Sequence, residues 1–213
     1  MVTHAYDEDY LAGAQRILGD AVDFAVMSLG FEPNRFGNLF AVSDSSKQFA
    51  AGNPKYIAGM NGCELARKVL IDTQTTFADI EDAMYLDKGP EYWAGWALAF
   101  YQWYSSFSFM EILKAVPLEK IKEMYPIYHE MDIMQFVDKI QEKMKLAYPQ
   151  TKLRLLRESS GLSQSELESV SGVPLRQIQL FEQRQRDINK TAAETLLKLS
   201  KALCCKMEDL IEH

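Results

Sequence analysis

Cysteine, glycine, proline and long apolar stretches are all scarce in this sequence of 213 residues. Three cysteines, two of them adjacent, do not make a disulfide framework, and we therefore expect a protein of the reducing cytoplasm. With only 11 glycines and 7 prolines, collagen-like and low-complexity classes are excluded. The longest apolar stretch, residues 92–100, is about half of the ~18 residues that a membrane span needs, and the acidic N-terminus has no signal-peptide segment. We expect no membrane partner.

Segments in which apolar and polar residues alternate are also missing, whereas apolar residues recur at helical spacing along the chain. We therefore predict an all-α fold. Pro33 and Pro90 suit the first turn of a helix, and Gly30 suits a helix C-terminus. In the first 150 residues the predicted helices span residues 9–29, 33–51, 63–71, 90–104, 108–116, 117–124 and 132–146.

Charge divides the chain into two parts. Residues 1–150 carry 13 Lys/Arg and 21 Asp/Glu, whereas residues 151–213 carry 10 and 9. Pro149 biases Tyr148 away from helical backbone angles, so we expect a helix to stop there. We predict an acidic, all-helical domain over residues 1–148 and a second domain over residues 151–213.

Helix signals follow one another closely in the second domain. A first helix, residues 152–159, ends before Gly161. A second begins at the capping box Ser163–Glu166 and stops at Gly172, and a third begins with Pro174 in its first position. Two helices joined by a short turn that contains glycine are typical of a helix-turn-helix. The apolar positions of these helices are Leu153, Leu156, Leu167, Val170, Ile178 and Phe181.

Two further helices complete the domain. Thr191 and Glu194 have the spacing of a capping box for a fourth helix, and residues 207–211 predict a short fifth one. The apolar positions of the fourth helix are Leu196, Leu197, Leu199 and Leu203.

The segment LRLLRESSGLSQSELESVSGVPLRQIQLFEQRQR, which starts at Leu153, resembles the Cro/C1 (Xre) family of helix-turn-helix DNA-binding domains. The resemblance covers residues 151–211 and includes Gly161-Leu162-Ser163-Gln164, Gly172-Val173 and Phe181-Glu182 in order. It implies a five-helix, lambda-repressor-like domain. Such a domain binds double-stranded DNA with its third helix, here about residues 174–182, in the major groove.

The resemblance implies that the outward face of the third helix reads bases. With Ile178 and Phe181 turned inward, a rotation of about 100° per residue defines that face. Arg176 has the fork that matches guanine O6 and N7, and Gln179 suits adenine or a phosphate. Leu180 departs from the family, which is usually polar there, and suits a thymine methyl group. The predicted base-reading residues are Leu175, Arg176, Gln179, Leu180 and Gln183.

The resemblance also implies phosphate contacts and one internal ion pair. Gln164 lies at the N-terminus of the second helix, where free N–H groups and the helix dipole favour an anion. Residues after the third helix would hold the neighbouring backbone, although the family often has glycine where this chain has Arg184. Arg157 and Glu182 would form a salt bridge between the first and third helices. The predicted phosphate-binding residues are Gln164, Arg184, Arg186, Asn189 and Lys190.

Two features of the first domain leave alternatives open. Four aromatic residues recur on one helical face, which favours a core position and leaves an apolar ligand pocket or partner groove as the alternative. The glycine-rich loop at residues 52–62 favours a plain connection over a phosphate-binding loop, because it lacks both nucleotide-binding patterns. The four aromatic residues are Trp93, Trp96, Phe100 and Trp103.

Patterns for catalysis and metal binding are not found in the sequence. His4, His129 and His213 are far apart along the chain, and the three cysteines lack metal-ligand spacing. We expect no catalytic residues, no metal and no cofactor, and thus no enzyme.

Together these patterns predict a sequence-specific, DNA-binding transcriptional regulator, and a palindromic operator would make it a homodimer. The acidic domain would then serve dimerisation, a protein partner or a small-molecule effector. One alternative is an antitoxin whose acidic domain binds a toxin and whose helix-turn-helix represses its own promoter. The others are a helix-turn-helix used only for protein contact and an enzyme with an attached DNA anchor.

Overall fold

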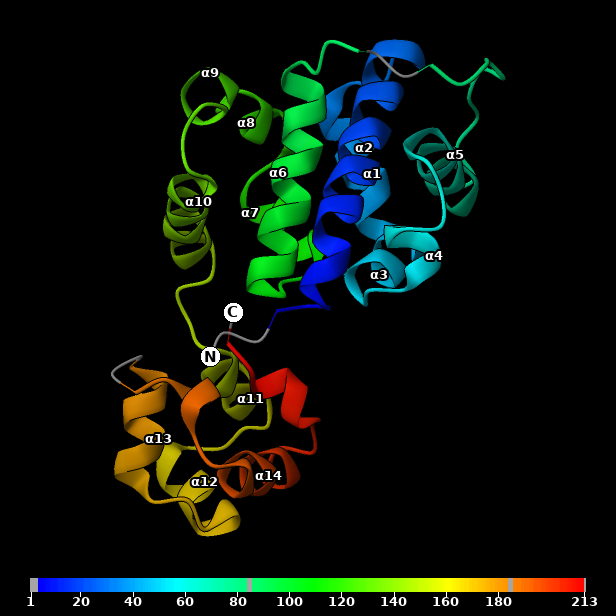
Figure 1. Cartoon of the computed structure of the whole chain (residues 1–213). Helices are drawn as coiled ribbons and strands as arrows, with labels where there is room; N and C mark the ends of the chain where they lie inside the picture. The colour runs from blue at the N-terminus through cyan, green and yellow to red at the C-terminus, as the bar shows by residue number, and fades with distance from the viewer. Residues whose placement is uncertain (1–3, 84–85, 184–185, 213) are drawn as a thin grey trace. The chain divides into compact units, whose positions relative to one another are not determined.

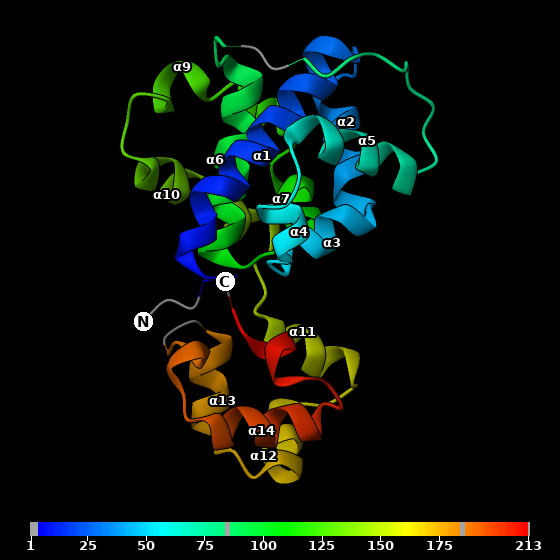
Figure 2. The same cartoon turned by 45° about the vertical axis from the view of Figure 1, so that its right-hand side comes forward.

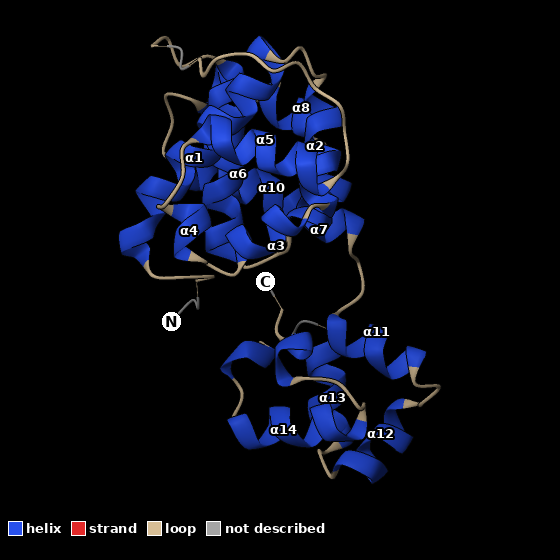
Figure 3. Cartoon of the chain, turned by 90° about the vertical axis from the view of Figure 1, so that its right-hand side faces the viewer, coloured by secondary structure: helices blue, strands red, loops and turns tan. Residues whose placement is uncertain are grey.

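The chain divides into two compact units, Met1–Ala147 and Tyr148–His213, which are described separately below (Figure 1). The computed structural model describes residues 4–83, 86–183 and 186–212, and within these ranges every regular element is a helix (Figure 3). The predicted all-α fold is confirmed. None of the helices in these ranges is both long and apolar enough to cross a bilayer.

The first unit consists of short and medium-length helices arranged around one central helix pair, α1 and α6. Its elements are η1 (Glu8–Tyr10), α1 (Leu11–Asp23), the π-helical turn η2 (Phe24–Ser28), α2 (Pro33–Val42), α3 (Asp44–Ala50), α4 (Pro54–Ile57), α5 (Gly62–Asp72), α6 (Pro90–Ser105), α7 (Phe109–Ala115), α8 (Leu118–Lys122), α9 (Tyr125–Tyr128) and α10 (Ile133–Ala147).

Helices α1 and α6 pack side by side and run in opposite directions (Figures 1 and 2). Before α1 begins, the N–H of Ala5 donates to the carbonyl oxygen of Trp103 at 3.0 Å, and Nε1 of Trp103 donates to the carbonyl oxygen of Tyr6 at 2.8 Å. Farther along, a Cβ atom on Gly95 would lie only 2.4 Å from the carbonyl oxygen of Leu18. Glycine at position 95 therefore lets the two backbones approach each other directly.

The prediction of one helix over residues 33–51 is wrong, because the helix is interrupted at Ser43, where α2 ends and α3 begins. The backbone of Ser43 is extended (φ −67°, ψ 157°), and its Oγ accepts a hydrogen bond from the N–H of Ser46 at 3.1 Å. A serine that caps a new helix competes with continuation of the preceding one. Ser45 then holds α3 against α5, since its N–H and Oγ both donate to Asp72 Oδ2, at 2.9 and 2.6 Å.

The glycine-rich loop at residues 52–62 contains the short helix α4, which was not predicted. At its end, Asn61 and Glu64 form a reciprocal capping box at the N-terminus of α5, with both hydrogen bonds at 2.8 Å. Gly62 packs so tightly on α1 that a Cβ atom there would lie 2.3 Å from the Cβ of Asp20. The chain's own side chains thus occupy this helix terminus, as in a connection between packed helices.

The aromatic face of α6 is only partly core. Trp93 and Trp103 are buried, with 7% and 5% of their surface exposed, whereas Trp96 and Phe100 are half-buried. Trp93 packs edge-on against Phe136 of α10, with ring centroids 5.3 Å apart. One end of the stripe therefore stabilises the contact between α6 and α10, and the half-buried rings remain accessible.

The second unit contains α11 (Lys152–Ser159), α12 (Gln164–Ser171), α13 (Leu175–Glu182), η3 (Ile188–Lys190), α14 (Ala193–Ala202) and η4 (Met207–Leu210). The helices enclose one apolar core, whereas Val170 and Leu197 are exposed and do not contribute to it. The buried core residues are Leu153, Leu167, Val173, Ile178, Phe181, Ile188, Leu196, Leu199, Leu203 and Leu210.

The predicted capping box of Thr191 and Glu194 is wrong. Helix α14 begins one residue later than that box requires, with Ala192 in the cap position and no side-chain cap. Thr191 ends the preceding 3₁₀ turn, and its Oγ1 accepts a hydrogen bond from Gln177 of α13 at 3.4 Å. Glu194 is then free to pair with Lys198 one helical turn later, at 2.7 Å.

Candidate nucleic-acid interface

A tight turn at Gly172 and Val173 joins α12 to α13. Gly172 ends α12 in the left-handed conformation (φ 68°), which glycine adopts without steric cost, and Val173 is buried. Helix α13 begins at Leu175, one residue later than predicted, because Pro174 has an extended backbone (φ −54°, ψ 136°). The carboxylate of Glu168 accepts the N–H of Leu175 at 2.8 Å and so fixes the start of α13 to α12.

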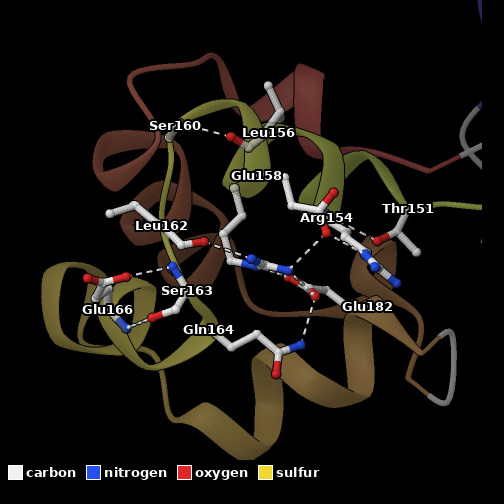
Figure 4. A network of polar contacts seen from close by, with 11 residues as sticks. Thr151, Arg154, Leu156, Glu158, Ser160, Leu162, Ser163, Gln164, Glu166 and Glu182 are labelled. Carbon is white, nitrogen blue, oxygen red and sulfur yellow. Dashed lines mark hydrogen bonds and ion pairs between the residues drawn. The ribbon is translucent and has the colours of Figure 1, made fainter.

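The N-terminus of α12 carries the capping box that its sequence predicts. Ser163 Oγ accepts the N–H of Glu166 at 3.2 Å, and the Glu166 carboxylate accepts the N–H of Ser163 at 2.7 Å (Figure 4). Hydrogen bonding from the Ser163 side chain, followed by the bond from its backbone N–H, lowers the pKa of Glu166, because the ionised carboxylate is the better acceptor. The start of α12 is thereby held in one geometry.

Arg157 and Glu182 form the predicted ion pair between α11 and α13. Arg157 Nε lies 2.6 Å from Glu182 Oε1, and the second fork nitrogen lies 2.9 Å from Oε2. The remaining nitrogen donates to the carbonyl oxygen of Leu162 at 2.7 Å. Hydrogen bonding to Glu182 is the main cause of a raised pKa for the Arg157 guanidinium. The pair thus connects the first and third helices and the loop before α12.

Gln164, predicted to contact a phosphate, belongs to the same network. Its side-chain amide donates to Glu182 Oε2 at 2.8 Å, and the residue is half-buried. Because Gln164 is the first residue of α12, its backbone N–H belongs to the helix terminus where the dipole favours anions. The side chain is held internally, so a phosphate at this position is expected to meet the backbone of α12.

The outward face of α13 carries polar side chains that no other described residue of the unit binds. Arg176 and Gln183 are exposed, Gln179 is half-buried, and within the described residues none of their side chains has a hydrogen-bond or ion-pair partner. Ile178 and Phe181, on the opposite face, are 0% and 3% exposed. The predicted burial of Ile178 and Phe181 and the predicted exposure of Arg176 and Gln183 are therefore confirmed. Leu175 and Leu180, the two apolar residues of the predicted reading set, are half-buried.

The predicted phosphate-binding cations after α13 differ in their contacts within the unit. Arg184 lies outside the described residues. Arg186 is exposed, with its guanidinium carbon 5.9 Å from the centre of the Phe181 ring. Lys190 is also exposed and lies 3.4 Å from the carboxylate of Asp187, a contact that leaves its ammonium group in solvent.

Asn189 has a structural partner that its sequence position does not indicate. Its Nδ2 donates to the carbonyl oxygen of Glu212, and its Oδ1 accepts the N–H of Glu212 at 2.9 Å. This amide therefore ties the segment after α13 to the end of the chain, and we assign Asn189 to that contact rather than to a phosphate. Glu168, Gln177 and Glu212 were likewise missed, because their partners lie between 7 and 23 residues away.

Comparisons with protein-family models, with curated proteins and with solved structures find no match to this chain. Among the residues placed by the structure, no group of three or more His, Cys, Asp or Glu side chains is arranged to hold a metal ion.

Proposed function

We propose that the chain is a sequence-specific DNA-binding transcriptional regulator that reads the major groove through α13. The observation that carries this proposal is a set of three polar side chains on the outward side of α13 and its C-cap, Arg176, Gln179 and Gln183, which have no hydrogen-bond or ion-pair partner among the described residues. Buried Ile178 and Phe181 hold that face outward. A helix of this kind fits a groove about 12 Å wide, where each base pair presents its own pattern of donors and acceptors.

Two side chains of the polar face, Arg176 and Gln179, suit different base edges. The Arg176 guanidinium suits the two acceptors of guanine, and the Gln179 amide suits the donor and acceptor of adenine. Gln183, nearly two turns after Arg176, extends the reading surface along the groove. The half-buried Leu180 lies between them and suits a thymine methyl group.

Rigid support behind α13 favours the same function. Base readout requires that side chains start from a fixed backbone, since misplacement weakens directional hydrogen bonds. Glu182 at the end of α13 is bound by Arg157 and Gln164, and the N–H of Leu175 at its start is bound by Glu168. Both ends of the reading helix are therefore tied to the neighbouring helices.

Phosphate binding would come from the exposed cations next to α13 and from the N-terminus of α12. Arg186 and Lys190 are exposed on the segment that follows α13. A single reading helix contacts few base pairs, so we further propose that a homodimer presents two copies of α13 to half-sites about 34 Å apart.

The test is fluorescence anisotropy with labelled DNA from the gene's own upstream region and with a scrambled duplex of equal length. Intact protein should bind the upstream DNA more tightly, and Arg176→Ala should weaken that binding by roughly 5- to 150-fold, equivalent to about 1–3 kcal/mol. Arg154→Ala is the matched control, because Arg154 is an exposed arginine of α11 paired with Glu158 at 2.8 Å. Weak binding of equal strength to both duplexes, unchanged by Arg176→Ala, would contradict the proposal. It would favour a helix-turn-helix that contacts protein.

A further inference from the structure

The first unit contains a cavity of about 570 Å³ beside the N-terminal half of α6. This volume lies within the range of about 300–1,000 Å³ that is usual for small-molecule sites. The cavity is bounded by α6, by α9 and by the segment that leads into α10. Aromatic rings make up most of its wall, together with one carboxylate. These residues are Tyr92, Trp93, Trp96, Tyr125, Tyr128 and Asp132, and the ammonium group of Lys88 is also part of the lining.

The aromatic wall is built from two separate elements and is held in place by packing. Trp93 of α6 meets Tyr125 of α9 edge-on, with ring centroids 5.9 Å apart. Tyr125 in turn stacks on His129 at 4.2 Å, and Tyr128 meets Phe136 at 6.4 Å. Trp96 and Tyr92 remain half-buried. Part of their ring surface is therefore accessible to a ligand.

One ring of this wall already binds a cation of the chain itself. The ammonium group of Lys88 lies over the Tyr92 ring, 4.4 Å from its centroid. The same ammonium group is 2.5 Å from Asp20 Oδ1, so its charge is neutralised within the first unit. The face of an aromatic ring attracts cations because its quadrupole is negative there. Lys88 shows that this attraction operates at the edge of the cavity.

The lining itself contains one carboxylate, that of Asp132, and one ammonium group, that of Lys88, and further carboxylates lie near Lys88 outside the lining. Asp132 is exposed in its lining, and Asp20 and Asp23 lie near Lys88 on the side of α1. Glu91 of α6 is within electrostatic range of Asp23 and shares Lys122 with Glu119. An anionic ligand would meet this excess of negative charge, whereas a cation would be attracted by it.

We propose that this aromatic cavity binds a small organic cation with a methylated ammonium group. Several aromatic faces together with one carboxylate are the combination that recognises such a group, because a methylated ammonium carries positive charge but is weakly hydrated. The Asp132 carboxylate adds the charge preference, and the rings add contact with the methyl groups. This site lies wholly in the first unit and does not depend on the DNA-binding function.

The test measures binding of choline and of tetramethylammonium to the intact protein by isothermal titration calorimetry at pH 8. The neutral comparison is 3,3-dimethylbutan-1-ol, which has the shape of choline with carbon in place of nitrogen. Choline is expected to bind at least tenfold more tightly than the neutral analogue. Equal affinity for choline and its neutral analogue would show that the pocket is apolar without a preference for cations. Absence of binding by both cations would show that the pocket is not a site for them. Each result would overturn the proposal.

Variants place the ligand in the cavity. Trp96→Ala should weaken choline binding by about tenfold or more. Phe100→Ala is the matched control, because it removes a second half-buried ring from the same helix, one turn later and outside the cavity lining. Circular dichroism establishes that both variants are folded. Choline binding that survives Trp96→Ala, or that is lost equally in both folded variants, would place the ligand elsewhere and overturn the proposal.

The charge preference has its own variant. Asp132 Oδ1 accepts the N–H of Met134 at 2.8 Å at the start of α10. Asp132→Asn keeps an oxygen for this hydrogen bond and removes only the negative charge. The variant should reduce the ratio of the affinity for choline to the affinity for its neutral analogue several-fold. An unchanged ratio would contradict a role of Asp132 in recognising the cation.

Discussion

Arg157 and Glu182 meet through two parallel hydrogen bonds of 2.6 and 2.9 Å, with only 10% and 3% of their side chains exposed. Ion pairs on the surface contribute little to stability, because water screens them and the side chains lose freedom on pairing. A buried pair behaves differently when one partner is removed, since the other charge is left without compensation. Arg157 also binds the carbonyl oxygen of Leu162, so the pair acts on three segments of the second unit at once.

We predict that Glu182→Ala unfolds the second unit, with a loss of about 3–5 kcal/mol in its free energy of unfolding. The two units can be observed separately in the intact chain, because all three tryptophans (Trp93, Trp96 and Trp103) are in α6 of the first unit. The helix signal at 222 nm in circular dichroism should therefore decrease, or should show an additional unfolding transition at lower temperature. The melting profile followed by tryptophan emission should stay unchanged.

Glu158→Ala is the control for this prediction. Glu158 pairs with Arg154 at 2.8 Å and with Arg157 at the longer distance of 3.7 Å, but its side chain is 42% exposed. Its removal should leave the stability of the second unit nearly unchanged, because water screens an exposed ion pair. An unchanged circular dichroism transition in Glu182→Ala would contradict the structural role of the Arg157–Glu182 pair.

Arg186→Gln should weaken DNA binding without changing its sequence preference. Arg186 is exposed on the segment after α13, and the proposed docking of α13 in the major groove would bring it to phosphates and not to base edges. Each phosphate contact contributes about 0.9 to the slope of log K against log salt concentration. The variant should therefore lower affinity for the upstream and the scrambled duplex alike and reduce the slope by about 1. A change in the ratio between the two duplexes, as expected for Arg176→Ala, would instead assign Arg186 to base reading.

Helix ends were predictable where their chemistry is local. Gly30 follows the first helical segment with a φ of 71°, and the box of Ser163 and Glu166 caps α12 as its spacing indicates. The break at Ser43 was not predictable, because the contact that holds the next helix joins Ser45 to Asp72, 27 residues away. Local patterns identify a possible cap, but distant partners decide whether the chain uses it.

The candidate sites show the same limit. The outward face of α13 follows from helical periodicity alone, so Arg176 and Gln183 were placed correctly from the sequence. The bond from Gln164 to Glu182 and the bonds between Asn189 and Glu212 connect residues 18 and 23 positions apart. No local pattern indicates these bonds. The aromatic cavity likewise needs α6, α9 and α10 together, and α9 was not among the predicted helices.

Gly95→Ala should destabilise the first unit by about 1–3 kcal/mol, although alanine is the better helix former. A Cβ atom at position 95 would lie 2.4 Å from the carbonyl oxygen of Leu18 and 2.9 Å from the Cα of Gly19, and backbone atoms cannot move aside as a side chain can. Urea unfolding followed by tryptophan emission measures the effect. Gly89→Ala is the control, because its Cβ would meet only the Glu91 carboxylate at 3.5 Å. A midpoint for Gly95→Ala at or above that of the unsubstituted protein would contradict the close approach of α1 and α6.

Asp23, the last residue of α1, is predicted to make the first unit less stable as the pH rises from 4 to 7. Only 5% of the residue is exposed, and burial raises the pKa of its carboxyl group to about 6. Lys88 acts against this rise, whereas Glu91 and Asp20 add to it. The native state therefore binds more protons than the unfolded chain between about pH 4 and 6. The stabilising contribution of protonated Asp23 is complete below about pH 4 and is lost as the pH passes 6.

Asp23→Asn removes this titration and keeps the shape of the side chain. At pH 7 the variant should have a free energy of unfolding higher than that of the unsubstituted protein by up to about 3 kcal/mol, and at pH 4 the difference should vanish. Urea unfolding followed by tryptophan emission at pH 4, 5, 6 and 7 measures the difference directly. Asp138→Asn, on the exposed face of α10, is the control and should show no gain that grows with pH. Because other carboxylates also titrate in this range, the result depends on the difference between variant and parent. A difference that is constant with pH, or that reverses at pH 7, would show that burial of the ionised Asp23 carboxylate does not limit the stability of α1.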